Sequence, residues 1–130
     1  LAAFHEVLVH ADCKPLCIYA NARQMTELLS NLLSNAIKYN KPGGEVWVTI
    51  TEEDKEMIIR VKDNGMGIPK ESLGRIFERF YRVDKGRSRK QGGTGLGLSI
   101  VKHIAGYYHG TITVQSELEA GTEFTVKIPI

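Results

Sequence analysis

The clearest hydrophobic pattern lies in residues 22–39, where apolar side chains recur at the spacing of one face of an α-helix. This stripe consists of Met25, Leu28, Leu29, Leu32, Leu33, Ala36 and Ile37. Asn21 stands before the stripe, and its side chain can accept from the first free backbone N–H groups. The run Asn-Lys-Pro-Gly-Gly at 40–44 ends the helix, because Pro and Gly extend the hydrogen-bond ladder poorly.

Two further helices are predicted. One spans about 95–108 and carries an apolar face of Leu96, Ile100, Val101, Ile104, Ala105 and Tyr108. The other is short, about 70–80, and follows the turn-rich loop 63–69.

Alternating apolar and polar residues predict strands at about 46–50 and 57–61, joined by a polar hairpin at 52–55. Two more strands are expected at 111–116 and 122–128, linked near Gly121. The first twenty residues suggest two short strands, 5–9 and 16–20, around a turn at 10–15. This order lacks strict strand–helix alternation and predicts an α+β fold: a two-layer sandwich, with one mixed sheet and helices on one face.

The length of 130 residues fits one domain, residues 1–130. No apolar run approaches the ~20 residues that a membrane helix requires. The N-terminus lacks the basic and apolar regions of a signal peptide. Because the chain begins with Leu1 rather than Met, we expect a piece of a longer protein, with residues 1–15 at the edge of a preceding linker.

The net charge of +2 argues against nucleic-acid binding by bulk charge. The positive charge is concentrated in residues 82–91, where Arg82, Lys85, Arg87, Arg89 and Lys90 face one acid, Asp84. Residues 82–94 form a basic, glycine-containing loop with almost no apolar anchors, so this loop is expected to be mobile.

A metal site made of Cys13, Cys17, His5 and His10 is one interpretation of the N-terminal region. The spacing contains no Cys-x-x-Cys pair and no following His-x₃₋₅-His, so it fits no common zinc pattern. Two ordinary thiols in a reducing compartment are the simpler expectation.

The polar side of the first helix carries Asn31 and Asn35 one turn apart, with Lys38 and Tyr39 beyond them. A solvated helix face explains polar residues in general, but asparagine is a poor helix former, and two of them suggest a use. A carboxamide oxygen is a hard ligand that suits Mg²⁺ bound to phosphate.

Residues 63–67, Asp-Asn-Gly-Met-Gly, have the composition of a tight turn. They also suit a nucleotide site. Asp63 can accept a hydrogen bond from an exocyclic amino group such as the N6 group of adenine, and Gly65 and Gly67 let the backbone approach a flat base.

Four glycines in residues 92–99 lead directly into the predicted helix 95–108. Close packing of the helix start explains them, and so does a phosphate site facing free N–H groups and the helix dipole. The P-loop motif and the motifs of serine/threonine kinases are both missing.

Four segments occur in the order of the N, G1, F and G2 boxes of sensor histidine kinases, and this combination closely resembles that family. The segments are residues 31–39, 63–68, 77–82 and 93–98, and residues 121–129 are similar to the closing strand of the family. The resemblance, which includes phosphate-regulon sensors, covers about residues 16–130. It implies the Bergerat fold, a mostly antiparallel mixed sheet under helices, with a mobile ATP lid.

The resemblance also implies a role for each matching residue. Asn35 would bind Mg²⁺ with Asn31 one turn before it, Lys38 would contact phosphate, and Tyr39 would lie against the nucleotide. Asp63 would read the adenine amino group, in a pocket shaped by Gly65, Gly67 and Ile68. Phe77 and Phe80 would anchor the lid, and Arg82 and Arg79 are candidates for a γ-phosphate contact. The phosphates would lie against Gly93, Thr94, Gly95, Leu96, Gly97 and Leu98.

The implied function is the binding of Mg-ATP and the supply of its γ-phosphoryl group to a histidine on a separate dimerisation domain. Hydrolysing relatives carry Glu where this chain has Asn31, and a carboxamide cannot serve as general base for water, which favours kinase over ATPase. His5 is followed by Glu6 but lacks the rest of an acceptor motif, so the chain alone should not phosphorylate itself.

A Bergerat-fold ATPase and a non-catalytic nucleotide-binding interaction module are the alternatives to the kinase. As further partners, the resemblance implies a downstream response regulator and no nucleic acid. It implies a monomeric fragment of a homodimeric parent, and a cytoplasmic domain of an inner-membrane-anchored sensor.

Overall fold

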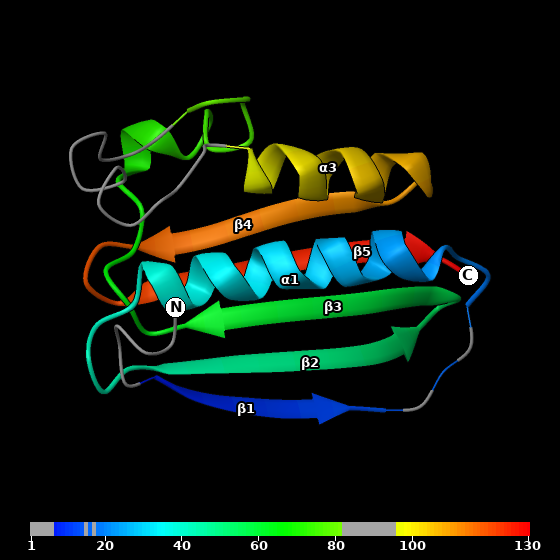
Figure 1. Ribbon diagram of the computed structural model, residues 1–130, viewed down its shortest axis with the longest axis horizontal. Coiled ribbons are helices and arrows are strands. Elements are labelled where there is room, and N and C mark those ends of the chain that lie inside the picture. The colour runs from blue at the N-terminus through cyan, green and yellow to red at the C-terminus, as the bar shows by residue number, and fades with distance from the viewer. Residues whose placement is uncertain (1–6, 15, 17, 82–95) are drawn as a thin grey trace.

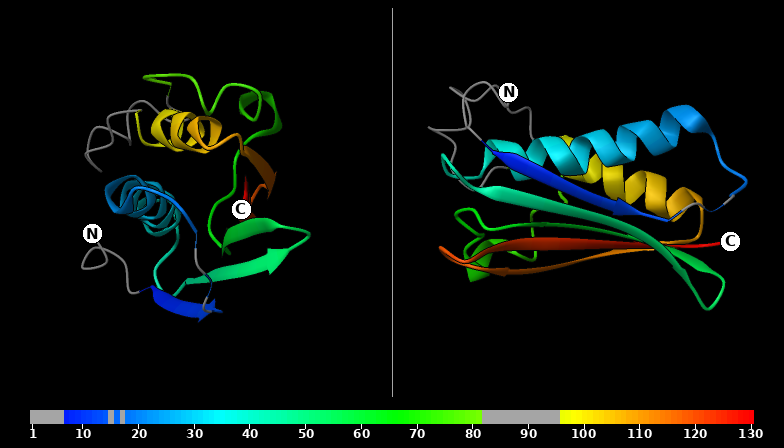
Figure 2. Two further views of the ribbon diagram at one scale, coloured as in Figure 1. Left: turned by 90° about the vertical axis from the view of Figure 1, so that its right-hand side faces the viewer. Right: turned by 90° about the horizontal axis from the view of Figure 1, so that it is seen from below.

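The computed structural model describes residues 7–14, 16, 18–81 and 96–130, and within these ranges two α-helices cover one face of a five-stranded sheet (Figure 1). The elements are β1 (Leu8–Cys13), α1 (Ala22–Lys38), β2 (Glu45–Glu53), β3 (Glu56–Asp63), the 3₁₀ turn η2 (Lys70–Ser72), α3 (Gly97–Tyr107), β4 (Thr111–Glu117) and β5 (Gly121–Pro129). Figure 2 shows both helices on the same side of the sheet. The α+β sandwich predicted from the sequence is confirmed.

The sheet has the order β1-β2-β3-β5-β4, and only the β1–β2 pair is parallel. The β2–β3 hairpin turns at Asp54 and Lys55, which have φ angles of 51° and 62°. Two consecutive residues with positive φ match the twist of a two-residue hairpin. In the β3–β5 pair, Asp63 lies opposite Thr122, so the end of β3 meets the start of β5.

The core lies between the helices and the sheet. Leu28 and Leu32 of α1 and Val101 of α3 are fully buried, which confirms the apolar stripes expected for both helices. The sheet contributes its inward residues, which are Val46, Val48, Met57, Ile59, Val61, Phe124, Val126 and Ile128. Residues that alternate with these, such as Thr49, Arg60 and Thr125, lie on the opposite face, so period-2 alternation directs one set of side chains to the helices.

Two sequence expectations are wrong in detail. Among the described residues of the two predicted strands, only Leu8 and Val9 lie in a strand, which runs from Leu8 to Cys13 and pairs with β2, whereas residues 16 and 18–20 are not in a strand. Residues 70–80 form η2 and a series of i→i+3 turns, among them Ser72 C=O with Arg75 N–H and Arg75 C=O with Glu78 N–H. Gly74 disfavours an α-helix here by about 1 kcal/mol relative to alanine, and the i→i+3 bonds replace the i→i+4 ladder.

The start of α1 carries the N-cap that the sequence predicts at Asn21. Asn21 accepts from the Gln24 backbone N–H at 3.1 Å, as expected for an N-cap. We expect Asn21→Ala to lower the free energy of unfolding by about 1 kcal/mol, because one backbone donor loses its partner. Urea denaturation measures the change. Asn21→Ser, which keeps a capping oxygen, should recover most of the loss, and equal losses in both variants would contradict the capping role.

Candidate functional site

A cavity of about 100 Å³ lies where the second half of α1 meets the loop after β3 and the start of α3. Its lining brings together residues from segments that are far apart in the sequence: Asn35, Tyr39, Asp63, Met66, Gly67, Ile68, Ile76, Tyr81, Leu98 and Thr122. Six of these were expected from the sequence, namely Asn35, Tyr39, Asp63, Gly67, Ile68 and Leu98.

Asp63 is the buried acid of the cavity, with 7% of its surface exposed. Its Oδ1 accepts from the Gly65 backbone N–H at 2.9 Å, and the Thr122 backbone also bonds its carboxyl group. Burial raises the pKa of Asp63 above its ordinary value, and these two hydrogen bonds offset only part of the increase. The carboxyl group is therefore fixed at the base of the cavity, in an environment that disfavours its charge.

The raised pKa of Asp63 predicts a pH dependence of stability. Folding shifts the equilibrium of Asp63 toward the neutral acid relative to the unfolded chain, so the contribution of Asp63 to stability is complete below the ordinary pKa of 3.8. It is lost as the pH rises through the higher folded-state pKa. The unfolding free energy of the wild type relative to Asp63→Asn should therefore increase as the pH falls from about 7 toward about 4. Urea titrations at several pH values measure this, and a constant difference would contradict it.

The loop after β3 is held against two other parts of the fold. A Cβ atom on Gly65 would lie 2.6 Å from the Tyr39 carbonyl oxygen, and one on Gly67 would lie 2.2 Å from the Glu117 carbonyl oxygen. Gly67 also has a φ angle of 75°, a conformation that favours glycine. Both glycines are thus required by close backbone approach. Gly67 lines the cavity, whereas Gly65 seats the loop and binds Asp63.

The four polar residues predicted on α1 divide into two pairs. Asn35 and Tyr39 line the cavity, as their spacing of four residues on one helix face allows. Asn31 instead donates from Nδ2 to the Glu27 carbonyl oxygen at 2.8 Å and borders a separate hollow beside Ile100. Its Oδ1 would lie 3.1 Å from a Cβ atom on Gly97. Lys38, the last residue of α1, is not among the residues that line the cavity.

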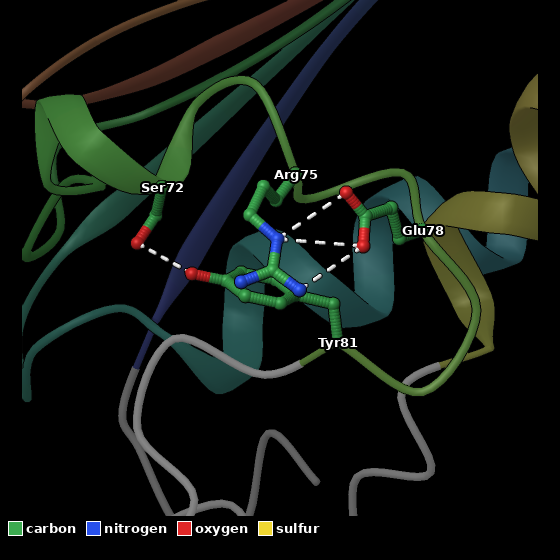
Figure 3. A network of polar contacts seen from close by, with 4 residues as sticks. All are labelled: Ser72, Arg75, Glu78 and Tyr81. Carbon is green, nitrogen blue, oxygen red and sulfur yellow. Dashed lines mark hydrogen bonds and ion pairs between the residues drawn. The ribbon is translucent and has the colours of Figure 1, made fainter.

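Tyr81 closes the cavity on the side of the 3₁₀ turns. Its hydroxyl group donates to Ser72 Oγ at 2.9 Å, and the guanidinium carbon of Arg75 lies 4.6 Å from the centre of its ring (Figure 3). Arg75 also pairs with Glu78 at 3.2 Å. Ser72 is buried, so its hydrogen bond to Tyr81 attaches the segment before residue 82 to the fold.

The two phenylalanines expected to anchor the lid differ in burial. Phe77 packs edge-on against Phe124 of the core, with ring centres 6.2 Å apart. Phe80 is 62% exposed, and the guanidinium group of Arg79 lies 5.3 Å from its ring centre. Of the pair, Phe77 alone is packed into the core, and neither Arg79 nor Phe80 lines the cavity.

The start of α3 faces the cavity through Leu98. Leu96 is the N-cap and Gly97 the first helical residue, two positions later than the predicted start at about 95. The first N–H groups of an α-helix have no partner within the helix, so this end suits an anion. Four predicted site residues, Arg82, Gly93, Thr94 and Gly95, and the predicted lid at 82–94 lie outside the described residues.

Four lining residues were missed as site residues from the sequence: Met66, Ile76, Tyr81 and Thr122. Tyr81 stands beside Phe80 within a segment that was singled out, so its aromatic ring was an available signal. Thr122 reaches the cavity through its sheet position opposite Asp63, which the local sequence does not encode.

The zinc interpretation of the N-terminal region gains no support. His10 donates from Nε2 to Glu45 Oε2 at 2.7 Å and stacks on Trp47, and Cys13 is an exposed free thiol. Across the described ranges, which omit His5 and Cys17, no three His, Cys, Asp or Glu side chains gather to hold a metal ion. In the same ranges neither helix has the length and apolar character needed to cross a membrane.

The chain is similar to known proteins in both sequence and structure. Residues 20–130 match the family described as "Histidine kinase-, DNA gyrase B-, and HSP90-like ATPase". "Sensor histidine kinase RppB" of Synechocystis sp. is 47% identical over 112 residues, which cover 86% of this chain and 25% of RppB. The structure of the "Mycobacterial sensor histidine kinase MprB" aligns with a TM-score of 0.86 and 28% identity, covering 98% of this chain and 87% of that one.

A third relative was solved with a nucleotide analogue. Full-length ShkA in complex with AMPPNP aligns with a TM-score of 0.82 and 30% identity, covering 98% of this chain and 26% of ShkA. The chain spans 20 to 25% of the length of the curated relatives that it matches. These similarities confirm the resemblance that the four ordered segments indicate.

Proposed function

The chain belongs to the family of histidine kinase-, DNA gyrase B- and HSP90-like ATPases, and we propose that it is the catalytic ATP-binding domain of a two-component sensor histidine kinase. It binds Mg-ATP in the cavity at Asp63 and supplies the γ-phosphoryl group to a histidine on a separate dimerisation domain. A downstream response regulator then receives the phosphoryl group. The parent protein is a homodimer anchored at the inner membrane, and this domain lies in the cytoplasm.

The observation that carries the proposal is the shared cavity of Asn35 and Asp63. Asp63 offers a fixed, buried acceptor for the adenine amino group, and Met66, Ile68 and Leu98 provide apolar surface for the flat base. Tyr39 lies against the nucleotide. A purine needs an apolar slot with few polar groups at defined positions, and the lining of this cavity has that character.

The phosphate end of the site extends from Asn35 toward the start of α3. Lys38 and Arg82 contact phosphate, Arg79 is a second candidate, and backbone N–H groups at Gly97 and Leu98 face the anion. The family resemblance implies that Gly93, Thr94, Gly95 and Leu96 would also present backbone to the phosphates, and the first three of these lie outside the described residues. Phosphoryl transfer depends mainly on positioning and on charge neutralisation, and these residue types supply both.

Magnesium suits the donor set of this site. The Asn35 carboxamide oxygen is a hard ligand on the cavity wall, while the Asp63 carboxyl group is engaged by two backbone N–H groups. Asn35 would hold the ion, and the ion would neutralise charge on the phosphates. Asn31 bonds its own helix and borders Gly97, and as a neutral amide it does not activate water.

We expect calorimetry to detect ATP binding by this chain, with affinity that increases when Mg²⁺ is present. Asn35→Ala should reduce the increase in ATP affinity that Mg²⁺ produces by about tenfold. The affinity for ATP without Mg²⁺ should stay nearly unchanged. Ser30→Ala, on the same helix but beside the other hollow, is the matched control. Steady phosphate release by the chain alone would instead favour the ATPase, and absence of any adenine nucleotide binding would refute the proposal.

A further inference from the structure

Ser116 lies at the centre of a small hydrogen-bond cluster behind the cavity wall. The Ile68 backbone N–H donates to Ser116 Oγ at 2.7 Å. The same oxygen lies 3.1 Å from the Gly121 carbonyl oxygen and 2.8 Å from Thr122 Oγ1. Ile68 and Thr122 line the cavity, and Ser116 at the end of β4 joins them. One side chain therefore couples the loop after β3 to the β4–β5 hairpin.

The hydrogen positions in this cluster follow from counting donors and acceptors. A serine hydroxyl group has one proton and two lone pairs. The Gly121 carbonyl oxygen can only accept, so the 3.1 Å contact requires the Ser116 proton. The two lone pairs of Ser116 then receive the Ile68 N–H and the Thr122 hydroxyl proton. Every hydrogen-bonding position of Ser116 is occupied in this arrangement.

The arrangement determines what Thr122 presents to a ligand. Its hydroxyl proton points to Ser116, so Thr122 Oγ1 has only lone pairs left for another partner, and Thr122 lines the cavity. Asp63 lies opposite Thr122 in the β3–β5 register, and both residues are less than 8% exposed. The Asp63 carboxylate also offers only acceptors. This corner of the cavity thus combines two buried acceptors and no side-chain donor from either residue.

We propose that Ser116 is a positioning residue for base selectivity, because it holds the Thr122 hydroxyl proton away from the cavity. The corner then accepts an exocyclic amino group and rejects a carbonyl oxygen at the same position of a purine. This inference rests on the proposed nucleotide-binding function. It goes beyond that function by assigning selectivity between amino and oxo purines partly to a residue that does not touch the ligand.

ATP and inosine triphosphate test the role of Ser116. ATP carries an amino group at C6 and an accepting N1, whereas inosine triphosphate carries an oxygen at C6 and a proton on N1. The N1 difference is common to wild type and variant, so it cancels in the change of the ratio. In Ser116→Ala the Thr122 hydroxyl loses its acceptor and is free to donate into the cavity, where it can bond the inosine oxygen. We expect calorimetry to show that the preference for ATP over inosine triphosphate falls about fivefold in Ser116→Ala. A purely structural role of Ser116 would weaken the binding of both nucleotides equally. The ratio of the two affinities would then stay unchanged, which would overturn the proposal.

Three variants and the wild type separate the remaining outcomes. Ser116→Thr keeps the hydroxyl group and should keep the wild-type ratio, as should Thr113→Ala, which removes an exposed hydroxyl group from the same strand. If circular dichroism shows that Ser116→Ala does not fold, Thr122→Val provides the test. It removes the acceptor at nearly constant volume and should lower the same ratio, and an unchanged ratio would overturn the proposal. If the wild type binds ATP but does not prefer it to inosine triphosphate, this inference alone is refuted. If the wild type binds neither nucleotide, the proposed function is refuted as well.

Discussion

Asp63→Asn should lower the affinity for ATP about 100-fold while the chain stays folded. Two backbone N–H groups, from Gly65 and Thr122, bond the Asp63 carboxyl group and require an acceptor. In the variant the single amide oxygen must serve them, so the amide NH₂ group turns toward the cavity. There it meets the amino group of adenine, and two donors face each other. Calorimetry measures the loss of affinity.

The same substitution should leave the ligand-free chain at least as stable as the wild type at neutral pH. Burial raises the pKa of Asp63, which means that ionisation of this group opposes folding, and the amide carries no charge. Loss of binding together with unchanged or higher stability is typical of a residue kept for function. Urea denaturation and circular dichroism measure stability and fold.

Asp54→Asn is the matched control for Asp63→Asn. Asp54 is exposed at the tip of the β2–β3 hairpin, and its φ angle of 51° suits asparagine equally well. The same chemical change there should leave ATP affinity within about twofold of the wild type. If Asp63→Asn binds ATP as well as Asp54→Asn does, the assignment of Asp63 to the adenine amino group is wrong.

Gly121→Ala should cause the largest loss of stability among the substitutions considered, about 3 kcal/mol or more. Gly121 has a φ angle of 121°, which side-chain-bearing residues rarely adopt. A Cβ atom there would lie 2.0 Å from the Asp63 carbonyl oxygen. The start of β5 would have to move away from the end of β3. Because Thr122 is the next residue, the movement would also displace a partner of Asp63.

Gly106→Ala serves as the control for Gly121→Ala. Gly106 lies in α3, and apart from its chain neighbours and the nearby helix backbone no atom stands within 4 Å of the position that its Cβ would take. Here alanine should raise the unfolding free energy by about 0.5 kcal/mol, since it reduces the freedom of the unfolded chain. Thermal or urea denaturation compares the two variants. Equal stability of Gly121→Ala and wild type would contradict the close approach of β5 to Asp63.

Local patterns predicted the elements that repeat over several residues. The apolar stripe of α1 placed Leu28 and Leu32 in the core, and Asn21 caps this helix as expected. The four strands after α1 were predicted because their inward and outward residues alternate. Prediction was wrong where tertiary contacts decide. The strand near the N-terminus lies where it can pair with β2. The segment after Pro69 forms i→i+3 turns, and its Tyr81 is held by a hydrogen bond to the buried Ser72.

The residues of the candidate site also fall into those that the local sequence predicts and those that strand pairing brings in. The sequence by itself determined that Asn35 and Tyr39 share a helix face and that Asp63 ends a strand before a glycine loop. Only the tertiary structure decided that Thr122 stands opposite Asp63 and that Ser116 bonds Thr122. The spacing of residues on a helix is fixed by local geometry, whereas the pairing of distant strands is set by register and burial across the whole sheet.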